Sequence, residues 1–396
     1  MTTTSLADAL GGVDVVLCCG AGGVGKTTTA AALGLAAVLA GRGRVLVLTI
    51  DPARRLADAL GLEEFGNVER RVEVADAPNS SELWVAMLDT SASWDDLVRQ
   101  HAPDQETIDR ILGNQLYRNI TERFVQSHDY IAMERLHSLH ASGRYDLIVI
   151  DTPPSRNALD FLDAPTRMAD FFSSSLLKWI TLPYRLGGER AGRLGYLAAK
   201  PFYQVADRIL GSQFLADIAE FFLLFQTMYD GFVRRAKEVE GLLHRGETCF
   251  VVVTSLEPAP LQEAEYFLAE LRRRRLLVGA LVLNRVLPSY LFYPPTRRLA
   301  SGLVAGPAPS GPARVQRRAA TAFLDLAALA DSERSSRNRL ANPPECVVEV
   351  PLVATDLHNL NGLLAVASVL WPRLEAGPVR KRPAERAASR SKKAPL

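Results

Sequence analysis

Cysteine is scarce in this sequence of 396 residues, and none of its four cysteines belongs to a C-x-x-C pair. Cys18, Cys19, Cys249 and Cys346 lie in or beside apolar stretches, where a thiol behaves as a small hydrophobic side chain. Disulfide frameworks and structural zinc sites need paired or closely spaced cysteines, and iron–sulfur clusters need several thiolates. The spacing therefore argues against all three kinds of site.

Long uncharged apolar runs are also missing, as is a basic start followed by an apolar core at the N-terminus. We therefore expect neither a membrane span nor a secretory signal, and a cytoplasmic location. The net charge is only +2, but residues 376–396 contain seven basic residues and one acidic residue. This predicts a disordered basic tail, serving as a solubilising end or touching anionic lipid or nucleic acid, on a body with no specific affinity for nucleic acid.

Short apolar runs with strand character recur along the chain and are separated by helical patterns. Several are nearly continuous in Val, Ile and Leu, which is typical of strands covered on both faces. The expected strands are Val13–Cys19, Arg44–Ile50, Leu83–Leu88, Leu147–Ile150, Cys249–Thr254, Val278–Asn284 and Val347–Val350. This alternation predicts an α/β protein with a doubly wound, mostly parallel sheet that binds its ligand at the carboxyl ends of the strands.

One interval breaks the alternation and predicts a helical subdomain inserted into the sheet domain. Residues 165–245 contain no convincing strand, and Phe221 and Phe225 belong to a stretch that is apolar all the way round a helix. The expected domains are 1–164 with 246–375 for the sheet domain, 165–245 for the helical insertion, and 376–396 for the tail. Within the sheet domain we expect a Gly/Pro loop over 301–312 and a helix near 315–329.

A complete G-x-x-x-x-G-K-[ST] motif follows the first expected strand and opens the first long helix. Its glycines allow backbone N–H groups to surround phosphate oxygens, Lys26 neutralises the β- and γ-phosphates, and the Thr27 hydroxyl is a Mg²⁺ ligand. The motif predicts a P-loop ATPase that uses ATP and Mg²⁺. The expected nucleotide-binding residues of this segment are Gly20, Gly22, Gly23, Val24, Gly25, Lys26, Thr27 and Thr28.

Two carboxylates come directly after expected strands and add to this site. Asp151 follows Leu147–Ile150, the usual place for the acid that orders Mg²⁺ and its waters. Asp51 follows the strand that ends at Ile50 and precedes a proline that stops it. An aspartate at a strand end is as often a turn former, but beside a P-loop the pair favours a catalytic site.

These motifs resemble those of the arsenite-transporting ATPase (ArsA) family, which includes the targeting ATPases for tail-anchored proteins and falls in the MinD/ParA class of dimeric P-loop ATPases. The family carries GKGGVGKT, DPAH and DTAPTGH segments, an asparagine after a late strand, and a PL-x-x-x-E segment. The corresponding segments here begin at Gly20, Asp51, Asp151, Asn284 and Pro351. The resemblance implies that Asp51 activates the attacking water, Asp151 helps hold Mg²⁺, Asn284 bonds the adenine, and Pro351 lies near the base.

Departures from the family pattern bear on assembly. The family's second loop residue is a lysine that reaches the nucleotide of the partner subunit, and here it is Ala21. This predicts a dimer with a lysine-bearing paralogue, whereas a homodimer would need Arg54, Arg55 or Arg156 to supply the charge. Neither the zinc-binding C-x-x-C pair of the targeting factor nor the arsenite-binding cysteines of the pump subunit are present.

Three functions remain open at this level. The first couples nucleotide state to an apolar helical client or a membrane-destined protein, with peripheral membrane association, and rests on the Phe-, Met- and Leu-rich interval 168–232. The same residues fit a subdomain core equally well, in which they pack only against each other. The second is the energising subunit of an anion pump, which the missing thiols weaken because arsenite favours thiolates. The third is a regulatory subunit that hydrolyses ATP weakly. A metabolic P-loop enzyme is disfavoured, since no further catalytic cluster is visible.

Overall fold

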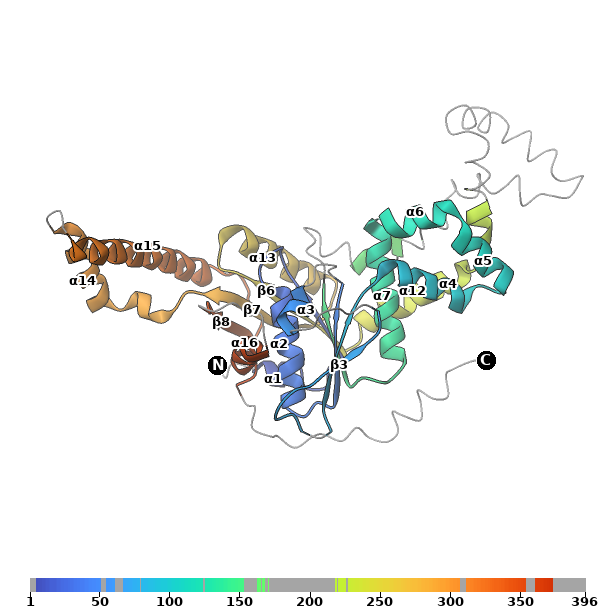
Figure 1. The fold of residues 1–396 in the computed structure, drawn as a ribbon, viewed down its shortest axis with the longest axis horizontal. Coiled ribbons are helices and arrows are strands. Elements are labelled where there is room, and N and C mark those ends of the chain that lie inside the picture. Colours follow the sequence, from blue (N-terminus) through green and yellow to red (C-terminus); the bar gives the residue numbers. More distant parts are fainter. Residues whose placement is uncertain are drawn as a thin grey trace, which may run out of the picture.

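The computed structural model describes most of the chain outside the middle of the expected insertion and the C-terminal tail (Figure 1). The described residues are 5–50, 55–60, 67–78, 80–123, 125–152, 162–164, 166–167, 170, 218, 220–225, 227–306, 311–353 and 360–372. In this part of the chain, no helix is long and apolar enough to cross a membrane.

One eight-stranded sheet forms the centre of the molecule, with the strand order β3-β4-β2-β5-β1-β6-β7-β8. All neighbouring strands are parallel except β3 and β4, which are antiparallel. The strands are β1 Val15–Cys19, β2 Arg44–Thr49, β3 Arg70–Val72, β4 Glu82–Met87, β5 Leu147–Asp151, β6 Thr248–Thr254, β7 Val278–Val286 and β8 Val347–Pro351. The predicted α/β class with a mostly parallel sheet is confirmed.

Helices cover both faces of this sheet because its central strands are apolar on both sides. In β1, Val15 and Leu17 belong to one buried cluster, and Val16 belongs to the cluster on the opposite face. The second cluster takes in α1 Leu6–Ala9, α2 Lys26–Leu39, α3 Arg55–Leu60 and α16 Leu360–Leu370. Gly34 of α2 allows close approach, since a Cβ there would lie 2.3 Å from Val47 Cγ2.

A group of helices packs beyond the other face and is held together by aromatic side chains. It contains α4 Thr90–His101, α5 Gln105–Gly113, α6 Gln115–Arg123, α7 Val125–Ala141 and α12 Tyr229–Leu243, while α13 Pro258–Arg273 covers β6 and β7. The ring of Trp94 in α4 stacks on that of Tyr130 in α7, with 5.7 Å between the ring centroids, and its centroid lies 6.3 Å from that of Phe225. The described part of the expected insertion thus packs on helices from 90–141, which the sequence assigned to the sheet domain.

Phe221 and Phe225 are core residues of this helical group. They are only 2% and 3% exposed, and their ring centroids lie 6.5 and 6.4 Å from that of Tyr117. These two side chains therefore stabilise the group and present no surface to a client. Most of the remaining insertion, including 171–217, lies outside the described residues, so the 165–245 domain boundaries stay a prediction.

A helical hairpin extends away from the sheet between β7 and β8 (Figure 1). We call it the arm, residues 289–338; it consists of the 3₁₀ turn η1 Ser289–Phe292, α14 Pro294–Ala305 and α15 Pro312–Asn338. The expected loop over 301–312 is therefore shorter, since 301–305 belong to α14. The helix expected near 315–329 is confirmed and runs further in both directions.

Candidate nucleotide site

The loop between β1 and α2 turns tightly where glycines occupy conformations that other residues rarely adopt. Gly20, Gly23 and Gly25 have φ angles of +152°, +78° and +95°. A Cβ at Gly20 would lie 2.0 Å from Val253 O, and one at Gly25 would lie 2.1 Å from Asn284 Nδ2. The neighbouring strands β6 and β7 therefore leave no space for a side chain at either position. The helix that follows directs its first N–H groups toward the loop, as anion sites at helix N-termini do.

Lys26, the first residue of α2, bends back over this loop and is almost fully buried. Its Nζ donates hydrogen bonds to the carbonyl oxygens of Gly20, at 3.0 Å, and Ala21, at 2.8 Å. These bonds hold the ammonium group beside the loop backbone. A phosphate that binds the loop N–H groups would therefore meet a fixed positive charge.

Asp151 brings together the ends of three adjacent strands. It ends β5, is fully buried, and its Oδ2 accepts hydrogen bonds from Thr27 Oγ1 at 2.6 Å and Thr49 Oγ1 at 3.0 Å. A carboxylate and a hydroxyl at this distance are the oxygen ligands that Mg²⁺ uses in phosphoryl-transfer sites. Thr27 and Asp151 thus fit the metal-binding role that the sequence predicts. Thr49, at the end of β2, carries no motif that would have revealed its contact.

Asn284 lies beside the loop although 260 positions separate it from the residue it contacts. Its Nδ2 donates to Val24 O at 2.8 Å, and its Oδ1 accepts from the N–H of Arg285 at 3.0 Å. Both bonds orient the amide against the P-loop from the end of β7. The adenine contact that the resemblance implies stays a prediction.

The other two predicted residues are placed less completely. Asp51 lies outside the described residues, but Ile50 before it donates its N–H to Asp151 O at 3.0 Å. Pro351 ends the edge strand β8, is exposed, and pairs in register with Val286. The structure therefore gathers Lys26, Thr27, Asp151 and Asn284 around the loop, whereas β6 and β7 separate the strand of Pro351 from β1.

The four cysteines are free, buried thiols. Burial raises the pKa of Cys19 and of Cys249 to about 12, and it raises the pKa of Cys18 and of Cys346 as well. Thiolates, which are the forms that bind zinc and arsenite, are therefore strongly disfavoured.

We expect neither arsenite nor zinc chelation to change ATP turnover or self-association. The measurement is steady-state phosphate release with and without each reagent. Stimulation by arsenite would contradict this expectation and support the anion-pump alternative.

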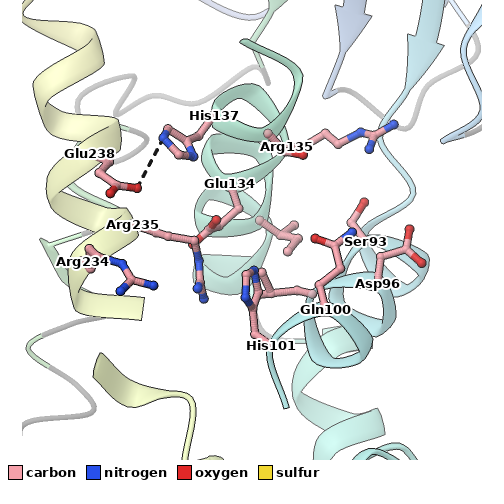
Figure 2. Close-up of a pocket in the computed structure, with 13 residues that line it drawn as sticks. Ser93, Asp96, Gln100, His101, Glu134, Arg135, His137, Arg234, Arg235 and Glu238 are labelled. Atoms are coloured by element: carbon pink, nitrogen blue, oxygen red, sulfur yellow. Dashed lines mark hydrogen bonds and ion pairs between the residues drawn. The ribbon is translucent and has the colours of Figure 1, made fainter. Parts of the chain in front are cut away.

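A cavity of about 480 Å³ lies between α4, α7 and α12 (Figure 2). On its wall Arg235 Nε donates to Glu134 Oε1 at 2.9 Å, and both side chains are buried. His137 faces Glu238 across 3.5 Å, as the dashed line in Figure 2 shows. The charged and titratable groups that line the cavity are Asp96 and His101 of α4, Glu134, Arg135 and His137 of α7, and Arg234, Arg235 and Glu238 of α12.

His101 makes the stability of this helical group sensitive to pH. Its burial and the nearby Arg235 and Arg234 lower the pKa of the imidazole from 6.5 to about 4. The unfolded chain therefore binds a proton at His101 more readily than the folded chain does. The stability that depends on a neutral His101 is complete above pH 6.5 and is lost as the pH falls toward 4. We expect the thermal midpoint to fall over this range, and to fall less in His101→Gln. The exposed His244→Gln serves as the control, and an equal fall in all three proteins would contradict the assignment.

Comparison with known proteins shows which family the chain belongs to. The model of the anion-transporting ATPase family, ArsA, matches residues 13–291. An ATPase ASNA1 homologue of Entamoeba dispar is 26% identical over 68% of this chain and 75% of its own length. The ATPase get3 of Aspergillus terreus is 27% identical over 68% of this chain and 72% of its own. The putative arsenical pump-driving ATPase 1 of Aquifex aeolicus is 26% identical over 69% of this chain, which spans 63% of that relative. The chain belongs to the anion-transporting ATPase (ArsA) family.

Proposed function

We propose that the chain is a Mg²⁺-dependent ATPase that hydrolyses ATP at the β1–α2 loop. The observation that carries the proposal is the meeting of Lys26, Thr27 and Asp151 at the carboxyl ends of β1 and β5. Loop N–H groups and Lys26 bind and orient the phosphates, and Thr27 with Asp151 would hold the metal. Bound Mg²⁺ would neutralise charge on the β- and γ-phosphate oxygens.

Asp51 is proposed to position and activate the attacking water. It follows β2, whose Thr49 contacts Asp151, so the chain enters this segment beside the proposed metal site. Asp51→Asn keeps the size of the side chain and removes its basicity. We expect ATP affinity within a few-fold of wild type and turnover reduced ~10²–10⁴-fold, as for loss of a general base.

Equilibrium binding and steady-state turnover measured on the same protein separate these two effects. Asp109→Asn, on the exposed surface of α5, is the matched control. Full turnover in Asp51→Asn would remove this residue from the mechanism, while loss of binding would assign it to nucleotide recognition.

The task coupled to hydrolysis is proposed to be a change in the pairing of two subunits that acts on a client. The anion-pump hypothesis agrees with the name of the Aquifex relative, and the tail-anchored targeting hypothesis comes from the resemblance of the sequence motifs. The raised pKa values of all four thiols favour the targeting hypothesis. Since Phe221 and Phe225 are buried, a client surface would have to lie elsewhere than on these two side chains.

A further inference from the structure

The outer face of α15 carries an apolar stripe that the described residues leave uncovered. Its members are spaced four, three, four and three residues apart: Val315, Ala319, Ala322, Leu326 and Leu329. Val315, Leu326 and Leu329 are 69%, 43% and 58% exposed, and both alanines are exposed as well. A mean spacing of 3.5 residues is the pattern of a helix that packs along another helix.

The contacts between α14 and α15 do not use this stripe. The side of α15 that points away from the stripe carries the buried Ala320 and Ala327. Arg297 of α14 binds Asp331 at 2.7 and 3.0 Å and Ala327 O at 3.1 Å, and Arg317 binds the carbonyl of Val304 at 2.6 Å. With 100° of rotation per residue, Arg317, Ala320, Ala327 and Asp331 point about a third to a half of a turn away from the centre of the stripe. The buried Ala330 borders the stripe beside Leu326. No described part of the chain covers the stripe, which therefore offers a face for another helix.

The order of large and small residues in the stripe is self-complementary. If a second α15 runs antiparallel about a two-fold axis at Ala322, Val315 faces the partner's Leu329 and Ala319 faces the partner's Leu326. Each small side chain beside the axis then receives a large one, and Ala322 meets its own copy. A parallel pair would instead place alanine against alanine twice, leaving gaps that cost packing contacts.

The charges beside the stripe fit the same arrangement. Arg318 and Asp325 are seven residues apart, so they lie on the same flank of the stripe, and both are exposed. Neither forms an ion pair within the part of the chain that the structure describes. Because their positions are nearly symmetric about Ala322, the antiparallel pair brings Arg318 to the partner's Asp325 and Asp325 to the partner's Arg318. An isologous interface repeats every such contact twice.

We propose that the arm is a homotypic interface, at which two copies of this chain associate through antiparallel pairing of α15. The stripe spans about 21 Å of helix, from Val315 to Leu329. The family match ends at residue 291, at the base of the arm, so the interface belongs to a part of the chain that the family model does not cover. The pairing uses no residue of the nucleotide loop, from which the arm extends away (Figure 1). It therefore stands independently of the proposed ATPase activity.

The first test is charge exchange measured by sedimentation of the full chain without nucleotide. Arg318→Asp alone sets Asp against Asp, and Asp325→Arg alone sets Arg against Arg, so each variant should associate at least ~10-fold more weakly than wild type. An equimolar mixture of the two variants should recover association, because the mixed pair has both ion pairs restored. Arg298→Asp, an exposed position on α14, is the control for net charge. Equal association of all proteins, or no recovery on mixing, would overturn the proposal.

The second test uses the burial of the native cysteines, which leaves an introduced thiol as the accessible one. Ala322→Cys should form an intersubunit disulfide with an added oxidant, because residue 322 meets its copy. Val315→Cys should not, although it lies on the same stripe, because its two copies lie about 21 Å apart along the antiparallel pair. Leu326→Glu combined with Ala322→Cys should abolish the cross-link.

Three outcomes would contradict the second-copy assignment. One is cross-linking of Val315→Cys as readily as of Ala322→Cys, which would indicate a parallel pair. The others are a strictly monomeric wild-type chain, or an effect of Leu326→Glu seen only as lost binding to vesicles of anionic lipid. Val68→Glu, at another exposed apolar side chain, controls for the added charge.

Discussion

Lys26→Ala is expected to abolish ATP turnover, with kcat reduced at least ~10²–10³-fold, as when one preorganised donor to a developing charge is removed. The substitution deletes the cation that is fixed over the loop by the carbonyls of Gly20 and Ala21. Affinity for ATP should fall as well, because the charge nearest the β- and γ-phosphates is lost. Both quantities can be read from calorimetric titration and phosphate release on the same preparation.

The control for this variant is Lys237→Ala, at an exposed lysine of α12. Because Lys26 is buried, the thermal midpoint of each variant must accompany the kinetics, so that loss of folding is separated from loss of charge. A folded Lys26→Ala protein with wild-type turnover would show that hydrolysis occurs elsewhere, and the proposed site would be wrong.

Ala21→Lys is expected to change turnover by a larger factor than Lys26→Ala. The direction of the change in turnover helps to distinguish a homodimer of this chain from a heterodimer. In the family the lysine at this position stabilises charge on the nucleotide of the partner subunit. A charge supplied across an interface can be worth ~10³–10⁵ in rate, judging by arginine fingers. A homodimer of this chain has Ala21 in both loops, so the wild-type chain alone should be slow and Ala21→Lys should accelerate it.

A heterodimer makes a further prediction. A paralogue with the GKGGVGKT loop would supply its lysine to the ATP of this chain, while Ala21 would leave the partner's site without one. Turnover should therefore rise on mixing, and Lys26→Ala in this chain should remove most of that rise. The paralogue carrying alanine at its own second loop position is the matched control.

The competing account is a homodimer in which an arginine replaces the lysine. Arg55 begins α3, whereas Arg54 and Arg156 lie outside the described residues. If the wild-type chain alone hydrolyses ATP at full rate and Ala21→Lys adds nothing, the heterodimer argument fails and these arginines become the residues to test.

Apolar runs predicted seven strands because strands covered on both faces need no polar alternation. The strand missed, β3, has three residues, two of them exposed arginines, and its pairing with β4 depends on the fold rather than on local pattern. In the arm, glycine and proline correctly indicated a break in the helical pattern, since α14 ends at Ala305 and α15 begins at Pro312. They also suggested a loop over 301–305, where Gly302 instead continues α14 and its carbonyl accepts a hydrogen bond from the N–H of Gly306.

At the site, the motif predicted Lys26 and Thr27, and the end of an apolar strand predicted Asp151; the structure places the three side chains together, while their roles stay predictions. Thr49 was not predicted, since its contact with Asp151 arises from the order in which β2 and β5 pair. The sequence also left open whether Phe221 and Phe225 were core or surface. Their partners Trp94 and Tyr117 come from helices more than a hundred residues earlier, which no local pattern relates to them.

The central claim is Mg²⁺-dependent hydrolysis of ATP at the β1–α2 loop. Release of phosphate from ATP labelled at the γ position, followed with the purified wild-type chain and with its paralogue added, tests it most directly. The account predicts release that stops on addition of EDTA, resumes with Mg²⁺ and is absent in Lys26→Ala. Release that is unchanged by EDTA, or that persists in folded Lys26→Ala, would contradict it.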